Sequence, residues 1–169
     1  TNREIFDIKN KINKFLEAAE KNQKEISEIH DEYQSLRKDL LTKSFNYGPA
    51  VPALEANFKS MEEEFNKFTV YTSKGDHVQA RESLNSVKQM IKKTSNYMSR
   101  IPGYLNKIEE LYPKELAQLR SGYKSLLDKR IAFANDQILQ DINSTESKLE
   151  NIYNYLEELK LKEAQKEMK

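Results

Sequence analysis

The stretch IFDIKNKINKFLEAAEKNQKEISEIHDEYQSLRKDL, residues 5–40, decides the fold. Its apolar residues recur at alternating spacings of three and four, and the polar Asn22 is the single interruption of that stripe. The stripe consists of Ile5, Ile8, Ile12, Phe15, Ala19, Ile26, Ile29, Tyr33, Leu36 and Leu40. A repeat of about 3.5 residues holds one helix face against a partner over many turns. We therefore predict a helix of some 45 residues, roughly 65–70 Å long at ~1.5 Å per residue.

Glycine and proline mark where this helix and the next one end. Gly48-Pro49 is a predicted break, because Gly suits the left-handed position after a helix and Pro suits the first turn of the next. At Lys74-Gly75-Asp76 we expect Gly75 to adopt a positive φ and Asp76 to cap the following helix. The three-four spacing continues after each break, through residues 49–74 and 76–101. Its members are Val51, Leu54, Phe58, Met61, Phe65, Phe68 and Thr72, then His77, Ala80, Leu84, Val87, Ile91, Thr94, Met98 and Ile101.

The apolar phase also passes through Pro102-Gly103 and Tyr112-Pro113 without a slip. Proline inside a helix usually kinks it, so we predict kinks that keep the helix direction. The later members of the stripe are Leu105, Ile108, Leu116, Leu119, Tyr123 and Leu126, followed after a weak region by Ile138, Ile142, Thr145, Leu149, Ile152, Leu156 and Leu159. Residues 161–169 have the pattern of the first turns of one more helix.

Short connections make neighbouring helices antiparallel. The sequence therefore predicts an all-α protein, built from elongated antiparallel three-helix bundles of spectrin-repeat type that share long helices. We expect residues 22–101 to form a complete triplet and residues 1–21 to be an overhang that belongs to a preceding repeat. Residues 102–169 would be a partial second triplet, with helices at about 104–132 and 134–159.

An internal repeat supports the triplet interpretation. At an offset of 88, residues Phe45, Leu54, Met61, Phe65, Asn66 and Phe68 match Phe133, Ile142, Leu149, Tyr153, Asn154 and Leu156. Ala80 then matches Ala164 at an offset of 84, after a four-residue deletion at the second turn. The repeated unit is a triplet whose last helix continues as the first helix of the next.

Composition excludes several classes of protein. Gly and Pro total only 8 of 169 residues, which argues against folds that need a turn at every strand end. The net charge is +1, whereas a nucleic-acid-binding protein or one that lies on anionic lipid would carry a basic excess. Cysteine is absent from the sequence, so disulfides and cysteine-based zinc sites are excluded.

No catalytic constellation is present in the sequence: it has no Walker loop, no GxSxG and no HExxH. We therefore expect no enzyme activity, no cofactor and no metal site. The two histidines have bland interpretations, His30 as a surface or seam-edge residue and His77 as part of a helix start.

One charged segment stands out, because residues 83–108 contain no acid. Its cations are Lys88, Lys92, Lys93, Arg100 and Lys107. A docking stripe for an acidic peptide or a membrane surface is one interpretation. We favour the other, in which the lysines near residues 86–88 pair with Glu62, Glu63 and Glu64 across the predicted hairpin.

Three stretches carry a resemblance to a known family. They are Tyr33–Leu41 with Phe45, Gly48 and Ala53–Glu55; Phe65–Phe68 with Gly75-Asp76 and Gln79–Glu82; and Ile101-Pro102 with Leu105, Leu111–Leu116 and Leu119–Tyr123. Over about residues 20–165 the chain resembles EzrA, the septation-ring regulator of Gram-positive bacteria. The third stretch is the most specific, because two prolines and a Ser-Gly-Tyr fall at set places in a helical sequence.

The resemblance implies a parent with one N-terminal membrane anchor and a long cytoplasmic series of spectrin-like triplets at the division septum. The family restrains assembly of the tubulin-like protein FtsZ and links the ring to the membrane and to wall-synthesis proteins. No partner-binding residue of the family can be assigned to this sequence. Its septal-localisation patch has no match here.

Two other functions stay open on sequence alone: a curved membrane-remodelling module of BAR type, and a generic cytoskeletal spacer rod. The near-neutral charge speaks against the first. We also expect weak homodimers through the open apolar seams, because Ile5, Ile8, Ile12 and Phe15 lack partners and the seam of residues 138–156 has a partner on one side only.

Overall fold

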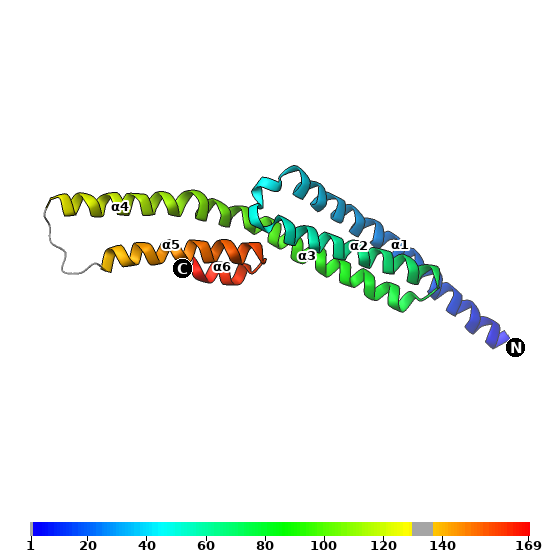
Figure 1. Cartoon of the computed structure of the whole chain (residues 1–169). Helices are drawn as coiled ribbons and strands as arrows, with labels where there is room; N and C mark the ends of the chain where they lie inside the picture. Colours follow the sequence, from blue (N-terminus) through cyan, green and yellow to red (C-terminus); the bar gives the residue numbers. More distant parts are fainter. Residues whose placement is uncertain (1, 130–136) are drawn as a thin grey trace. The chain divides into compact units, whose positions relative to one another are not determined.

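The structure of the chain is a computed structural model that describes residues 2–129 and 137–169. These residues form helices and short connections with no strand (Figure 1), which confirms the predicted all-α class. The helices are α1 (Asn2–Thr42), α2 (Val51–Ser73), α3 (His77–Asn106), α4 (Tyr112–Asp128), α5 (Gln137–Glu157) and α6 (Leu161–Glu167), with 3-10 turns η1 (Ser44–Asn46) and η2 (Gly48–Ala50) and a π-helical segment η3 (Lys107–Leu111).

The contacts divide the chain into two compact units. Unit 1 comprises Thr1–Leu41 and Ala56–Ser95, and unit 2 comprises Thr42–Glu55 and Asn96–Lys169. Both units therefore combine segments that are distant in sequence.

Unit 1 has a core between α1, α2 and α3. Tyr33 of α1 packs its ring edge-on against Phe58 of α2, with the centroids 5.7 Å apart, and Arg81 of α3 donates a hydrogen bond to Asn22 of α1. The buried side chains come from all three helices: Ile29, Tyr33, Leu40, Phe58, Met61, Phe68, Ala80, Leu84, Val87, Ile91 and Thr94. The predicted apolar stripe of each helix therefore faces the other two.

The turn between α2 and α3 has the predicted chemistry. Gly75 has a φ of +73°, and Asp76 Oδ1 accepts a hydrogen bond from the Gln79 amide at 3.1 Å. The Gly75 and Asp76 amides donate to the carbonyls of Thr72 and Tyr71, respectively. This paired arrangement is the Schellman motif, which satisfies the last carbonyls of a helix. Both predicted roles, the positive φ of Gly75 and the cap by Asp76, are confirmed.

The turn between α5 and α6 repeats this motif without a glycine. Leu159 has a φ of +56°, and the Leu159 and Lys160 amides donate to the carbonyls of Leu156 and Tyr155. Ala80 and Ala164, which stand five residues beyond the two left-handed positions, are both fully buried. The two alanines that match at an offset of 84 therefore occupy equivalent positions after two turns with the same hydrogen bonds. The proposed partner of Phe45, Phe133, lies outside the described residues.

Unit 2 is built around the corner at residues 47–50. Gly48 has a φ of +47°, and a Cβ at this position would lie 3.1 Å from Leu105 Cδ1, so any larger residue would be strained and crowded. The core around this corner contains Tyr47, Ala50, Leu54, Met98, Ile101, Leu105, Ile108, Leu116, Ile142, Ile152, Leu156, Leu161 and Ala164. Helix η2 therefore contributes to the same core as α5 and α6.

Two boundaries differ from the sequence prediction. The first helix ends at Thr42 rather than near residue 47, and two 3-10 turns follow it, which leave Phe45 79% exposed. Helix α3 continues through Pro102 to Asn106, and the irregular segment is η3, directly before Tyr112-Pro113. A π-helical segment relieves the clash between a proline ring and the carbonyl four residues earlier. Pro113 thus coincides with the break, whereas Pro102 is accommodated within the helix.

Phe58, rather than Phe65, is the fully buried aromatic residue of α2. Phe58 is 1% exposed, whereas Phe65 is only half-buried. The three-four spacing places Phe65 in mid-seam, but in the structure it lies at the edge of the stripe, where its ring meets Tyr33 and His30.

We expect Phe58→Ala to lower the free energy of unfolding by about 3–5 kcal/mol, the cost of truncating a fully buried Phe. Phe65→Ala should cost about half as much or less, because part of that ring is already in water. Chemical denaturation of both variants measures the difference. Equal losses would show that the two rings are buried alike.

Candidate partner-binding surfaces

The histidines occupy surface and edge positions. His30 of α1 is exposed, with its ring edge-on to Phe65 at 5.7 Å. His77 at the start of α3 is half-buried beside Phe15, with ring centroids 5.8 Å apart, and its amide donates to the Gly75 carbonyl. Among residues 2–129 and 137–169, no three His, Asp or Glu side chains are grouped so that they could hold a metal ion.

The acid-free segment has partners other than those predicted. Glu25 of α1 accepts from Arg81 and lies 3.3 Å from Lys88 Nζ, while Glu62 bonds to Arg37 and Glu64 to Lys67. The predicted pairing of Lys88 with the acids of residues 62–64 is wrong. In unit 2, Arg100 donates to Tyr104 and Gln165. Lys88 and Arg100, two of the five cations of the acid-free segment, are thus engaged within the protein, which weakens the interpretation of this segment as a docking stripe.

Helices α1 and α2 of unit 1 form a groove that the sequence did not reveal. We call it the aromatic groove, and its volume is about 850 Å³. It is lined by Gln23, Ile26, Ser27, His30, Tyr33, Gln34, Glu62, Phe65, Asn66, Phe68, Thr69, Thr72 and Ser73. Phe65 packs against both His30 and Tyr33, at centroid distances of 5.7 and 5.4 Å. The groove therefore contains a cluster of aromatic side chains, and most of its other lining residues are polar.

A hydrogen-bond network fixes one end of the aromatic groove. The Tyr33 hydroxyl donates to Glu62 Oε1, and Arg37 Nη1 donates to the Tyr33 hydroxyl at 2.9 Å and to Glu62 at 2.6 Å. Burial of Tyr33, followed by its hydrogen bond to Glu62, raises the pKa of this phenol. The network therefore holds the Tyr33 ring in place against Phe58 and Phe65.

The rim of the aromatic groove is poor in charge. Charged residues make up 33% of the chain, yet Glu62 is the one acid or base that lines this groove, apart from His30. Glu62 is already neutralised by Arg37. Depletion of charge together with enrichment in Tyr and Phe is typical of the centres of protein interfaces. The surface is thus suited to an uncharged or apolar helix face of a partner.

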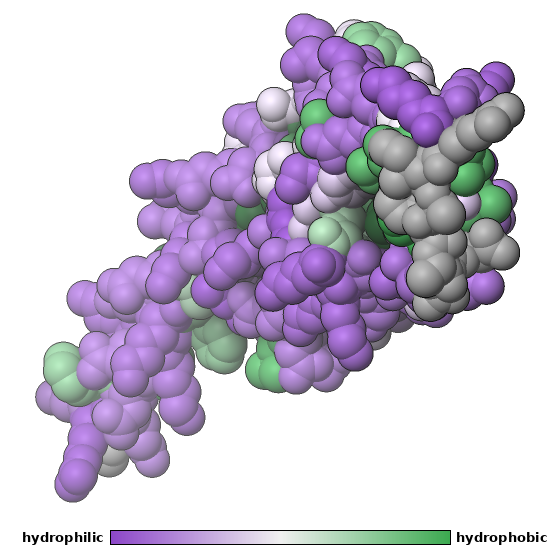
Figure 2. Space-filling model, turned by 90° about the vertical axis from the view of Figure 1, so that its left-hand side faces the viewer, coloured by the Kyte–Doolittle hydropathy of each residue, from purple (hydrophilic) through white to green (hydrophobic). Residues whose placement is uncertain are grey.

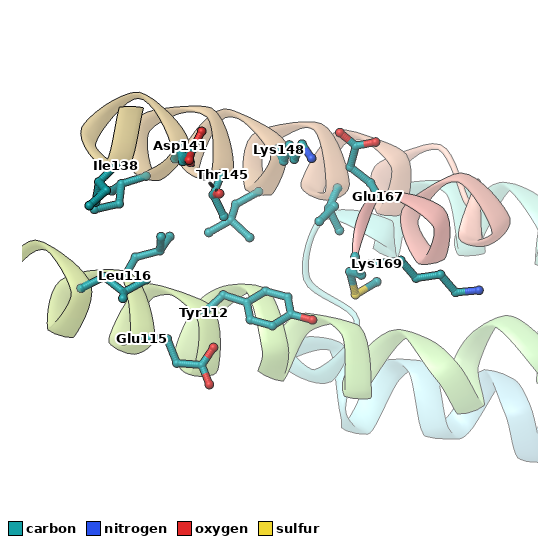
Figure 3. A pocket seen from close by; sticks show the side chains of 14 residues that line it. Tyr112, Glu115, Leu116, Ile138, Asp141, Thr145, Lys148, Glu167 and Lys169 are labelled. Carbon is teal, nitrogen blue, oxygen red and sulfur yellow. Dashed lines mark hydrogen bonds between the residues drawn. The ribbon is translucent and has the colours of Figure 1, made fainter. Parts of the chain in front are cut away.

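Unit 2 has a second groove, between α4 and α5 and next to the end of α6. We call it the open groove, and its volume is about 480 Å³. In Figure 3, Tyr112 and Leu116 of α4 face Ile138 and Thr145 of α5 across it. Leu119 and Ile138 are 58% and 41% exposed, although both belong to the apolar stripe. The groove is therefore an apolar surface that the described residues leave uncovered.

Less of the apolar stripe of α5 is exposed than the sequence predicted. We expected the stripe from Ile138 to Leu156 to be buried on one side only, but Ile142, Ile152 and Leu156 are fully buried. The turn η2 and helix α6 cover this part of α5, and Leu161 and Ala164 of α6 are themselves buried. Within α5, the exposed members of the stripe are Ile138 and Thr145, and Leu149 is half-buried.

The beginning of α1 in unit 1 is a third apolar surface. Ile5, Ile8, Ile12, Phe15 and Leu16 are each more than half exposed. By contrast, the face drawn in Figure 2 is dominated by hydrophilic residues, interrupted by few hydrophobic patches. None of the helices within the described ranges combines the length and hydropathy that a membrane span requires.

Comparison with known proteins yields one family. A family model described as "Septation ring formation regulator, EzrA" matches residues 1–169. Similar curated proteins named septation ring formation regulator EzrA include that of Listeria innocua, 28% identical over 163 residues, and that of Bacillus licheniformis, 29% identical over 161 residues. The matches cover 96% and 95% of this chain, but only 28% of each relative.

The homologous protein of Enterococcus faecalis is 27% identical over 148 residues, which is 88% of this chain and 26% of that protein. The chain thus spans little more than a quarter of the length of the curated relatives that it matches. No solved structure matches the chain significantly.

We expect Glu25→Gln to lower the free energy of unfolding by about 1 kcal/mol, the upper end for a partly exposed ion pair. The hydrogen bond from Arg81 lowers the pKa of Glu25 against the opposing effect of burial. A lowered pKa in the folded state gives stability that is present above the pKa of the unfolded chain, near 4.5, and is lost as the pH falls.

Urea denaturation of the wild-type and Glu25→Gln chains at pH 7 and in the acid range tests this prediction. The difference between the two should shrink below about pH 4.5, where the wild-type carboxylate becomes protonated. Glu28→Gln is the matched control, because Glu28 is 4.0 Å from Lys24 on the exposed face of the same helix. A difference that stayed constant with pH would contradict the role of the Glu25 charge.

Proposed function

Because the chain belongs to the EzrA family of septation ring formation regulators, we propose that it is a spectrin-like rod segment through which such a regulator restrains FtsZ assembly and holds division proteins together. The match of the family model over residues 1–169 is the observation that carries this proposal. The chain covers about 28% of its relatives, so the segment would supply one part of the function of a longer protein.

The proposed organisation is a series of helical triplets. Residues 22–101 would be one triplet, residues 1–21 an overhang of a preceding repeat, and residues 102–169 part of a following one. Two observations support it: three helices share the core of unit 1, and the turns at Gly75 and Leu159 have the same hydrogen bonds. A helix that runs from one triplet into the next would fix the orientation of the two triplets relative to each other.

The proposed mode of action is binding without catalysis. The sequence has no Walker loop to couple nucleotide hydrolysis to work. A protein that binds the unassembled subunit, or the end of a polymer, shifts assembly by mass action, in proportion to the sites it occupies. The effect on FtsZ should therefore rise with the molar ratio of the two proteins and reach a plateau.

The aromatic groove is the surface that we propose for contact with a division protein. It joins two helices of one unit, so a partner helix could rest on both, and the single carboxylate of its lining, Glu62, is already paired with Arg37. We propose that binding takes place at the cytoplasmic face of the membrane at the septum. A segment outside this chain would supply the membrane anchor.

We expect the chain to reduce the mass of FtsZ polymer that sediments in the presence of GTP, in a saturable manner. A double variant, Asn66→Lys with Thr69→Lys, should abolish the effect, because both side chains are exposed on the groove and the change adds bulk and charge there. Ser60→Lys is the matched control on the exposed face of the same helix. Circular dichroism of each variant confirms that the fold is retained.

If the wild-type chain leaves FtsZ polymer unchanged at every ratio and does not sediment with it, this segment does not restrain FtsZ. An undiminished effect of the double variant would instead place the contact elsewhere on the rod.

A further inference from the structure

The helix that continues from α3 into α4 changes its geometry at η3, within unit 2. Residues Lys107–Leu111 form a π-helical turn, and the Tyr112 amide donates to the Lys107 carbonyl, five residues earlier. In an α-helix the same amide would donate to the carbonyl four residues earlier. A π turn therefore holds about one residue more than an α turn.

The proline that follows η3 does not account for the π turn by itself. Pro113 has no N–H to donate, and its ring crowds the carbonyl four residues earlier. Pro102 has the same two defects, yet it lies inside α3, which stays α-helical through Asn106. A second cause therefore acts at η3.

That second cause is the spacing of the buried side chains. In the part of α3 that belongs to unit 2, Met98, Ile101 and Leu105 are buried at intervals of three and four residues, and Ile108 of η3 follows after three more. The next buried residue is Leu116, eight residues after Ile108. Two α turns take up about 7.2 residues, so eight residues of α-helix would leave these two side chains about 80° apart.

One π turn restores the alignment of the buried face. A π turn and an α turn together take up about eight residues. Ile108 and Leu116 can thus lie on the same face, and they are 6% and 7% exposed. We expected the apolar phase to pass Tyr112-Pro113 without a slip. The stripe instead contains one extra residue there, which the π turn absorbs.

Glu115 shows what a regular helix would do instead. Seven residues of α-helix turn through about 700°, so Glu115 would point within about 20° of the direction of Ile108. A carboxylate would then face the core of unit 2, where it would lose its hydration, and Leu116 would turn outward. In the structure Glu115 is exposed, and in Figure 3 it points away from α5, whereas Leu116 faces α5.

We propose that η3 is a register joint between α3 and α4, in which one extra residue keeps Leu116 rather than Glu115 in the core. Conversion of η3 to α-helix would turn α4 about its axis by about 100°, the rotation of one residue, relative to α3. The joint thereby fixes which face of α4 a partner can reach. This inference does not depend on the proposed function, because it concerns the packing of unit 2 alone.

The first test separates the effect of the spacing from that of the proline. Pro113→Ala removes the ring and restores an amide, but Ile108 and Leu116 stay eight residues apart. The π turn should persist, and NMR couplings across hydrogen bonds should still connect the Tyr112 amide to the Lys107 carbonyl. A coupling from Tyr112 to the Ile108 carbonyl would overturn the inference, because the proline alone would then produce the π turn.

The second test changes the spacing in the Pro113→Ala chain, where no proline opposes an α-helix. Deletion of Glu109, an exposed residue of η3, sets Ile108 and Leu116 seven residues apart. A regular α-helix then aligns the two side chains, so the midpoint of urea denaturation should equal or exceed that of the Pro113→Ala chain.

Deletion of Ser99 in the same background is the matched control. Ser99 is exposed in the α-helical part of unit 2, between the buried Met98 and Ile101. No π turn is present there to be removed, so this deletion should lower the midpoint. If the Glu109 deletion lowers the midpoint by half as much as the Ser99 deletion or more, the extra residue does not have the proposed role.

A third measurement reports directly which side chain is buried. Cysteine is absent from the chain, so Leu116→Cys and Glu115→Cys each introduce a single thiol. The thiol at position 115 should react with a soluble thiol reagent at least about tenfold faster, because a buried thiol reacts only after local opening. Equal rates at the two positions would show that α4 is not held in one register, and would overturn the inference.

Discussion

The burial of one broad apolar stripe per helix by two neighbouring helices is the constraint on which this structure depends. Helix α1 shows it within a single element. Its stripe has the same spacing throughout, yet Ile29 and Tyr33 are 4% exposed where α2 and α3 lie alongside, and Ile5 is 66% exposed where they do not. Burial of apolar surface contributes about 25 cal/mol per Å², so most of the stability of this helix comes from its packed part.

The turns between helices decide where that burial can occur. A left-handed residue at Gly75 or Leu159 closes the preceding helix with two amide-to-carbonyl bonds and reverses the chain within a few residues. Leucine adopts this conformation at a cost of roughly 1–2 kcal/mol, which the packing of Leu156 and Leu161 on either side offsets. The corner at Gly48 differs, because two factors require a glycine there: its positive φ and its close contact with Leu105.

The sequence was sufficient to predict the helical class, the two glycine breaks and most of the buried stripe, because these depend on spacing along one chain. It could not predict how far each helix is rotated about its axis. Phe65 was therefore placed in mid-seam although it lies at the edge, and the aromatic groove that it forms with His30 was missed. The partner of Lys88 was wrong for a related reason: adjacency in the hairpin suggested α2, whereas the flank of α3 that carries Lys88 faces Glu25 of α1.

The distribution of charge then limits where a partner can bind. Charged residues make up 33% of the chain, and several of their side chains form ion pairs, such as Arg120–Glu146 and Glu25–Arg81. Covering such a surface removes water from charges that already have partners, and little is gained in return. Covering the aromatic groove or the apolar surfaces removes water from fewer charged groups. These surfaces are therefore the more favourable places for a partner to bind. In a helical protein whose sequence has no catalytic motif, selectivity for partners then follows from which stretches of each stripe stay uncovered and uncharged.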